Sequence, residues 1–166
     1  MDHKHFQTMF EYNYWAHRLV WDCAMHLTDE QFGQHRDYSI GSVHQQFVHI
    51  MSVESLWFSR LHGESPTVLF NIADYPTREA VRSKWDEIEG NLRGYLGQLQ
   101  SNNLMQIISY KSIKGVSHRM TVIGILSHVI NHGTDHRAQI LPVLYDLGAP
   151  TVEQDMIYFL LERDLE

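Results

Sequence analysis

The chain has 166 residues, 43% of them hydrophobic and 20% charged, which is typical of a globular protein and predicts one domain over residues 1–166. Its formal net charge of -7, with 13 scattered Lys and Arg, argues against a nucleic-acid partner, because phosphate binding needs clustered cations. The apolar runs are too short to cross a bilayer and the N-terminus has no signal-peptide pattern, so we expect a cytoplasmic protein with no membrane partner.

The first predicted element is an amphipathic helix over residues 6–27, in which apolar residues recur at steps of three and four. The polar side chains of Asn13 and His17 interrupt its apolar face near the middle. A second, more apolar helix is predicted over residues 42–61. It should begin at Ser42, which opens a capping-box pattern that satisfies the first backbone amides of a helix.

Two more long helices are predicted in the remaining part of the sequence. An apolar stripe indicates a helix over residues 77–99, and the β-branched segment 107–120 then indicates a small hairpin or an extended loop. A fourth helix is predicted over residues 121–148 with a kink at Pro142, and a short last helix over residues 153–162. Four long amphipathic helices in one domain predict an all-α four-helix bundle with a short C-terminal helix.

Histidine is unusually abundant, with 12 residues against 13 Lys and Arg together. In the fourth predicted helix, His128, His132 and His136 follow one another at a spacing of four, which places them on one helix face. Two neighbouring imidazoles of this kind can bind one divalent ion. The outer two are about 12 Å apart along the axis at 1.5 Å per residue, so one ion can take only one adjacent pair.

A third ligand must therefore come from another element, and His49 in the second helix is the candidate. A lone histidine between Val48 and Ile50 would be interpreted as a core residue bonded to a backbone carbonyl. Beside a histidine pair on a neighbouring helix the balance changes, because bundles build metal sites from inward-facing ligands on opposed helices. On the residue pattern alone, a metal site made by the second and fourth helices and a structural core histidine both stay open.

Five short motifs, spread over nearly the whole chain, carry a family resemblance. They are Tyr12-x-x-Trp15-Ala16, His49-Ile50-x-x-x-Glu54-x-x-Trp57, Asn131-His132-x-x-x-His136-Arg137-x-Gln139-Ile140, Leu144-x-x-Leu147-Gly148 and Asp155-x-x-x-Phe159. In this order and spacing they resemble the DinB/YfiT-like superfamily of metalloenzymes. The sequence departs from the family's usual pattern at His17, Ala138 and Pro142, and none of the three departures removes a ligand.

The resemblance implies a four-helix bundle with up-down-down-up connectivity, often assembled as a homodimer. It also implies a metal ion, commonly zinc or nickel, held by one histidine of the second helix and two of the fourth. Carried over residue by residue, these ligands are His49, His132 and His136.

Two polar residues on the inward face of the first helix are candidate pocket residues. His17 is the candidate catalytic residue, as a pocket base, a fourth ligand or a donor to a ligand; the alternative is a partly buried histidine bonded to a neighbouring carbonyl. Asn13 is the candidate for binding a substrate or cofactor. His44 is expected on the rim of the pocket, His128 in its wall, and Glu54 in a structural hydrogen bond or ion pair.

Three neutral imidazoles leave an ion its full charge and an open coordination position, which suits catalysis. Such a site lowers the pKa of bound water or of a thiol. Some superfamily members use low-molecular-weight thiols such as bacillithiol or mycothiol, so the resemblance implies a metal-dependent thiol S-transferase acting on a small-molecule substrate. Two alternatives stay open: a metal-dependent hydrolase, and a non-catalytic metal-binding protein associated with stress.

Overall fold

The structure is a computed structural model, and it describes residues 2–163. Four long helices form the body of the molecule: α1 (His3–Ala24), α3 (Val43–Leu61), α4 (Arg78–Gln98) and α5 (Val122–Asp146). Shorter elements connect or follow them: α2 (Asp29–Gly33), the 3-10 turns η1 (Ile72–Asp74) and η2 (Ser101–Asn103), the strands β1 (Ile107–Lys111) and β2 (Ser117–Thr121), and α6 (Met156–Arg163).

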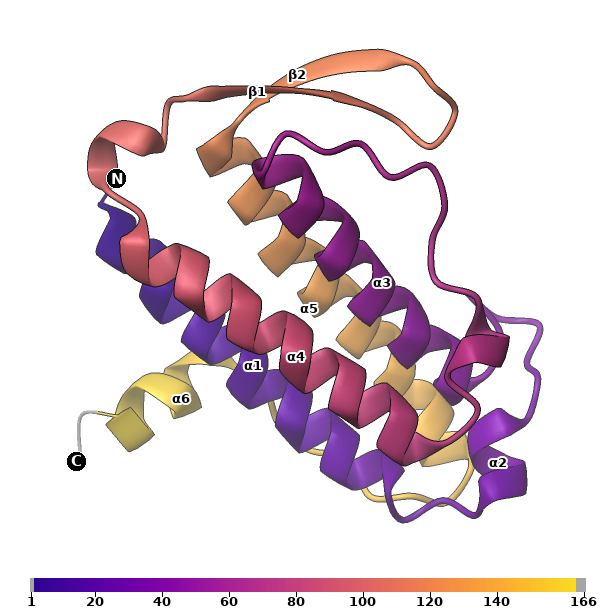
Figure 1. Cartoon of the computed structure of the whole chain (residues 1–166). Coiled ribbons are helices and arrows are strands. Elements are labelled where there is room, and N and C mark those ends of the chain that lie inside the picture. The colour runs from indigo at the N-terminus through magenta and orange to yellow at the C-terminus, as the bar shows by residue number, and fades with distance from the viewer. Residues whose placement is uncertain (1, 164–166) are drawn as a thin grey trace.

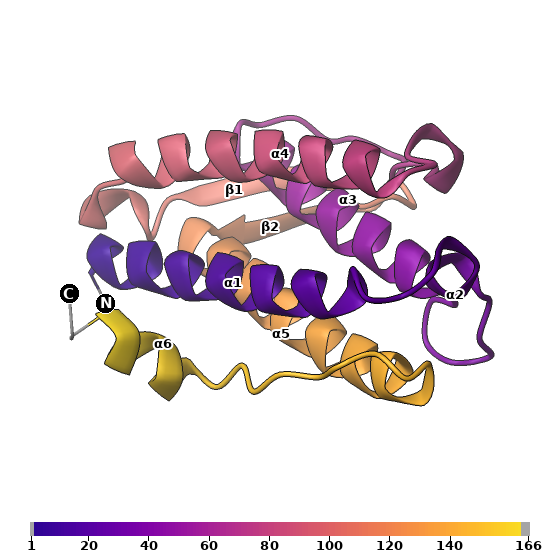
Figure 2. The ribbon, with the colours of Figure 1, turned by 90° about the horizontal axis from the view of Figure 1, so that it is seen from below.

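The four long helices have the up-down-down-up connectivity that the resemblance implied. α1 and α5 run in one direction, and α3 and α4 run in the other (Figure 1). α5 packs against both α1 and α3, and α4 packs against the same two helices. The view from below shows α6 beside α1, reached by an extended segment from the end of α5 (Figure 2). The prediction of a helical bundle with a short C-terminal helix is confirmed.

The starts of the long helices follow from their capping residues. The hydroxyl of Ser42 accepts the amide of Gln45 in a complete capping box, and Thr77 and Thr121 cap α4 and α5 in the same position. These starts agree with the predicted ones. The fourth helix continues through Pro142 to Asp146.

Three features differ from the prediction. The first helix, predicted over residues 6–27, spans His3–Ala24, because Asp2 caps it by accepting the amide of Lys4. The last helix begins at Met156 and not at residue 153, because Gln154 is held by other contacts: its backbone carbonyl accepts the hydroxyl of Tyr12, and its side chain accepts the guanidinium of Arg137. The short helix α2 was not predicted; Thr28 begins it with a capping box of its own.

Most of the apolar core lies in two large clusters, one at each end of the bundle. One surrounds Trp85 and Phe47 near α2, and the other surrounds Phe10 and Ile125 near the β1–β2 hairpin. Buried polar residues lie between these clusters along the helices: Asn13, His17, Glu54, His136 and Arg137. The polar side chains that carry chemistry therefore lie at the middle of the bundle.

Among residues 2–163, no helix is long and apolar enough to span a membrane.

Candidate metal centre

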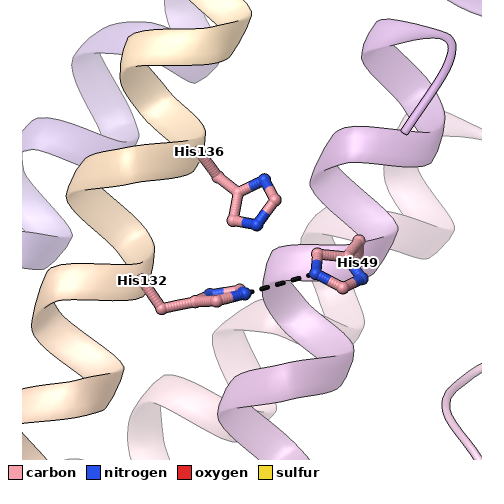
Figure 3. A group of neighbouring side chains, drawn as sticks. All are labelled: His49, His132 and His136. Atoms are coloured by element: carbon pink, nitrogen blue, oxygen red, sulfur yellow. Dashed lines mark hydrogen bonds between the residues drawn. The ribbon is translucent and has the colours of Figure 1, made fainter. Parts of the chain in front are cut away.

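Three histidines from two facing helices converge in the middle of the bundle. His49 lies on α3, and His132 and His136 lie one turn apart on α5, with all three rings directed into the same space (Figure 3). One ring nitrogen from each residue lies within 4.8 Å of the others. The structure thus brings together the three residues that the resemblance named as ligands.

The spacing of the ring nitrogens fits a single metal ion. The Nε2 atoms of His49 and His132 are 3.2 Å apart. Two nitrogens bound to one ion at 2.0–2.1 Å with a tetrahedral angle would be about 3.3 Å apart. The ring of His136 lies 4.3 Å from that of His132 and 4.7 Å from that of His49, centroid to centroid. The two-helix framework therefore holds the donor atoms close to the separation that a metal ion requires.

All three rings are held in the neutral form that binds metal. Burial, with the neighbouring histidines, lowers the pKa of His49 to about 4 and that of His132 to about 3. Burial also lowers the pKa of His136. At neutral pH these imidazoles are uncharged, so each can offer a nitrogen lone pair to a cation.

A glutamine that the sequence analysis did not select orients the third ligand. The Nδ1–H of His136 donates to Oε1 of Gln46 at 3.0 Å, with the proton assigned to Nδ1 because the amide oxygen can only accept. That assignment leaves Nε2 of His136 with its lone pair free. Gln46 precedes His49 by three residues, which places both on one face of α3. This spacing is the signal that could have identified it.

Of the two further histidines expected around the pocket, His128 lies next to the three histidines, and His44, expected on the rim, does not. The ring of His128 lies 5.8 Å from that of His132 and packs edge-on against Trp57 at 4.9 Å. His44 lies elsewhere, stacked on Phe32, with Nε2 2.7 Å from the carbonyl oxygen of Tyr75.

Asn13 and His17 lie in a buried polar network beside the three histidines. Both side chains are almost fully enclosed, with exposed fractions of 0% and 1%. Nε2 of His17 is 3.3 Å from Oε1 of Glu54 and 3.4 Å from the guanidinium of Arg137, which donates to Oδ1 of Asn13 at 2.7 Å. Glu54 also accepts the indole N–H of Trp85 at 2.9 Å, the structural hydrogen bond expected of it. Roles for Asn13 and His17 in substrate contact or catalysis stay predictions.

The close contact between α5 and α1 at this network depends on a glycine. A Cβ atom at Gly133 would lie 2.5 Å from Oδ1 of Asn13 and 3.1 Å from Nε2 of His17. The absence of a side chain lets the polar groups of α1 approach the backbone of α5 between the two α5 histidines. One face of α5 thus serves the histidine site and another serves the buried network.

Comparison with known proteins agrees with this fold. The model of the DinB family matches residues 1–164. The chain belongs to the DinB family. It is 22% identical over 163 residues to Protein DinB of Bacillus subtilis (strain 168), covering 95% of each protein. The crystal structure of a DinB-like protein from Bacillus cereus ATCC 10987 superposes with a TM-score of 0.64 at 18% identity, over 92% of this chain and 98% of that one. The family predicted from the motifs is confirmed.

Proposed function

We propose that the protein binds one divalent metal ion, zinc or nickel, through His49, His132 and His136, and that it transfers a low-molecular-weight thiol to an electrophilic small molecule. The observation that carries the proposal is the convergence of three neutral imidazoles from two rigid helices. When bound, a divalent ion with three neutral ligands keeps its charge and an open position, and so lowers the pKa of a thiol that reaches it.

The chain's own contribution is a fixed and accessible set of ligands. Gln46 holds the ring of His136 in one tautomer and orientation. His49 and His132 are only half-buried, so part of each residue is in contact with solvent. Placing these residues on helices and not on loops keeps their separation constant during turnover.

The nucleophilic thiol has to come from outside the chain. The single cysteine, Cys23, packs in the apolar cluster at the α2 end of the bundle, and burial raises the pKa of its thiol. A buried thiol with a raised pKa is inert. A small-molecule thiol is therefore the species that this site is suited to use.

The same geometry favours a thiol over water as the nucleophile. The pKa of a free thiol, about 8.5, is already close to neutral, whereas that of water, about 15.7, has to be lowered much further by the ion. Among residues 2–163, the metal-binding group contains no carboxylate. The buried carboxyl of Glu54 is engaged with Trp85 and Asn13. The hydrolase alternative therefore has less support from the site.

A conjugation assay tests the proposed reaction. Metal-loaded and metal-free protein are compared with bacillithiol, mycothiol, glutathione and coenzyme A against a generic electrophile. We expect at least one thiol to be conjugated faster by the metal-loaded protein, and this excess to be lost in His49→Ala. If metal-loaded protein never exceeds metal-free protein with any thiol, the transferase proposal fails. Ester or amide hydrolysis by the metal-loaded protein would then favour the hydrolase.

We also propose a homodimer, which rests on the family resemblance. Light scattering at micromolar concentration should give twice the chain mass of 19.5 kDa. A monomer mass would remove this part of the proposal.

A further inference from the structure

A second feature lies at the hairpin end of the bundle, outside the three-histidine site. A cavity of about 910 Å³, widely open to solvent, lies between the β1–β2 hairpin and the loop after α3. Its walls carry two cationic side chains, a histidine, the hydroxyls of three serines and a tyrosine, and a glycine: Lys111, Arg119, His118, Ser65, Ser109, Ser117, Tyr110 and Gly63. This volume suits a small molecule. None of the residues in these walls is acidic.

The charge of this end is opposite to that of the chain as a whole. The protein carries 20 acidic residues and a net charge of -7, but residues 90–134 contain none of the acids. Among residues 2–163, Lys111 and Arg119 form no ion pair. Glu64 follows Gly63 in the loop but is exposed and is not part of the cavity wall. The cavity therefore presents positive charge that no carboxylate of its walls balances.

A buried cation behind the wall adds to this charge. Arg60 is 96% buried, its guanidinium lies 4.3 Å from the ring centroid of Trp57 and 4.5 Å from that of Tyr110, and it donates to the backbone carbonyl of Lys111 at 3.3 Å. It forms no ion pair with the described residues, and its Nε has no hydrogen-bond partner among them. A buried charge without a counter-charge strengthens the field on any anion nearby, because little water screens it.

A row of packed rings lies between the cavity and the three-histidine site. Tyr110 lines the cavity and packs edge-on against Trp57 at 5.2 Å. Trp57 contacts His128 at 4.9 Å, and His128 contacts His132 at 5.8 Å. Few side chains thus separate the positive cavity from the nearest metal-binding ring.

From these features we infer that the cavity binds the carboxylate or phosphate group of a small molecule, with Lys111 and Arg119 as its charged partners. This molecule is the acidic thiol or acidic substrate whose other end reaches the histidines. The second statement rests on the proposed function, whereas binding of the anion itself needs no metal.

A titration followed by backbone amide NMR tests this inference. Inorganic phosphate and succinate are added separately to metal-free His132→Ala protein, so that no ion at the histidines can bind the anion. We expect saturable shifts at the amides of cavity residues such as Ser109 and Ser117. The double variant K111Q/R119Q should weaken binding at least about tenfold, since it removes two charge-assisted contacts. The preference between phosphate and succinate identifies the kind of acidic group.

A matched variant separates a site from general charge. Lys114 lies in the same hairpin, is exposed and is absent from the cavity wall, so K114Q should leave the dissociation constant within about twofold. Equal weakening by K114Q would overturn the inference, as would the absence of saturable shifts with both anions. Failure of metal binding leaves this titration unaffected. If the protein binds neither anion but its metal-loaded form still conjugates a neutral thiol, the inference is refuted and the proposed function stands.

Discussion

The Nε2 atoms of His49 and His132 lie 3.2 Å apart, although 83 positions separate the two residues in the chain. Burial lowers the pKa of both, so at neutral pH the two rings meet as neutral groups with lone pairs and not as charges that repel. A hydrophobic bundle gains nothing from burying three such rings together, one fully and two in part. Their arrangement is explained if they share one cation.

Replacing Gln46 should weaken metal binding without removing it. In Gln46→Leu the Nδ1–H of His136 loses its acceptor, so the ring is no longer fixed in orientation or tautomer. We expect affinity to fall about 10–100-fold with one ion still bound at saturation. Gln46→Glu keeps an acceptor in the same place and should retain most of the affinity. Competition titrations with a chromogenic chelator give both constants, and equal affinity of the leucine variant and the parent would contradict the orienting role.

The pH dependence of stability should reveal the buried carboxyl of Glu54. Burial raises its pKa to about 7 from an ordinary 4.5, so the folded protein binds this proton more tightly than the unfolded chain. The contribution of Glu54 to stability therefore decreases as pH rises from about 4.5 through 7. The buried histidines contribute in the opposite direction, because a lowered pKa favours folding as pH rises. The Glu54 effect has to be isolated by difference.

Urea unfolding of Glu54→Gln and the parent, at pH 5 to 8, provides that difference. We expect the variant to gain stability relative to the parent as pH rises, by about 1–3 kcal/mol over the range. Glu64→Gln, at an exposed position, is the control and should show no comparable trend. A difference for Glu54→Gln that does not change with pH would show that the carboxyl is charged throughout.

Gly133→Ala should destabilise the protein, although alanine is the better helix former by about 1 kcal/mol. The new Cβ would lie 2.5 Å from Oδ1 of Asn13 and 3.1 Å from the guanidinium of Arg137, so the buried network must shift. We expect a net loss of about 1–3 kcal/mol in the free energy of unfolding. Gly90→Ala on α4 meets no atom within 4 Å and should stabilise the protein slightly. A stabilising Gly133→Ala would mean that the network tolerates the extra methyl group.

The variant His17→Asn should show whether His17 acts as a pocket residue or as a metal ligand. His17 is outside the group of three metal-binding residues but within 3.4 Å of Arg137, the neighbour of His136. We expect metal content equal to that of the parent and turnover about tenfold lower. Loss of metal would make His17 a ligand, and unchanged turnover would make it purely structural.

Much of the fold could be predicted because its signals are local. The apolar periodicity of the four long helices and the caps at Ser42, Thr77 and Thr121 each act within a few residues. The pair His132 and His136 is local in the same sense, since one helical turn brings the two together. The pairing with His49 needed the family resemblance, because the packing of α3 on α5 joins residues far apart in the chain.

The rest depends on contacts that a single sequence does not contain. The start of α6 moves to Met156 because Tyr12 and Arg137, both distant in the chain, hold Gln154. The hairpin cavity follows from how β1 and β2 lie against the end of α3. The polar positions on α1 indicated an inward face, but whether that face meets solvent or an enclosed network is decided by tertiary packing.

Elemental analysis of untagged protein tests the central claim most directly. The parent and His128→Ala should each carry close to one zinc, nickel or similar ion per chain, and His132→Ala should carry almost none. His128→Ala is the matched control, because it removes a histidine from the same face of α5 one turn away. Metal retained in His132→Ala but lost in His128→Ala would contradict the account, and so would a parent protein that binds no divalent ion.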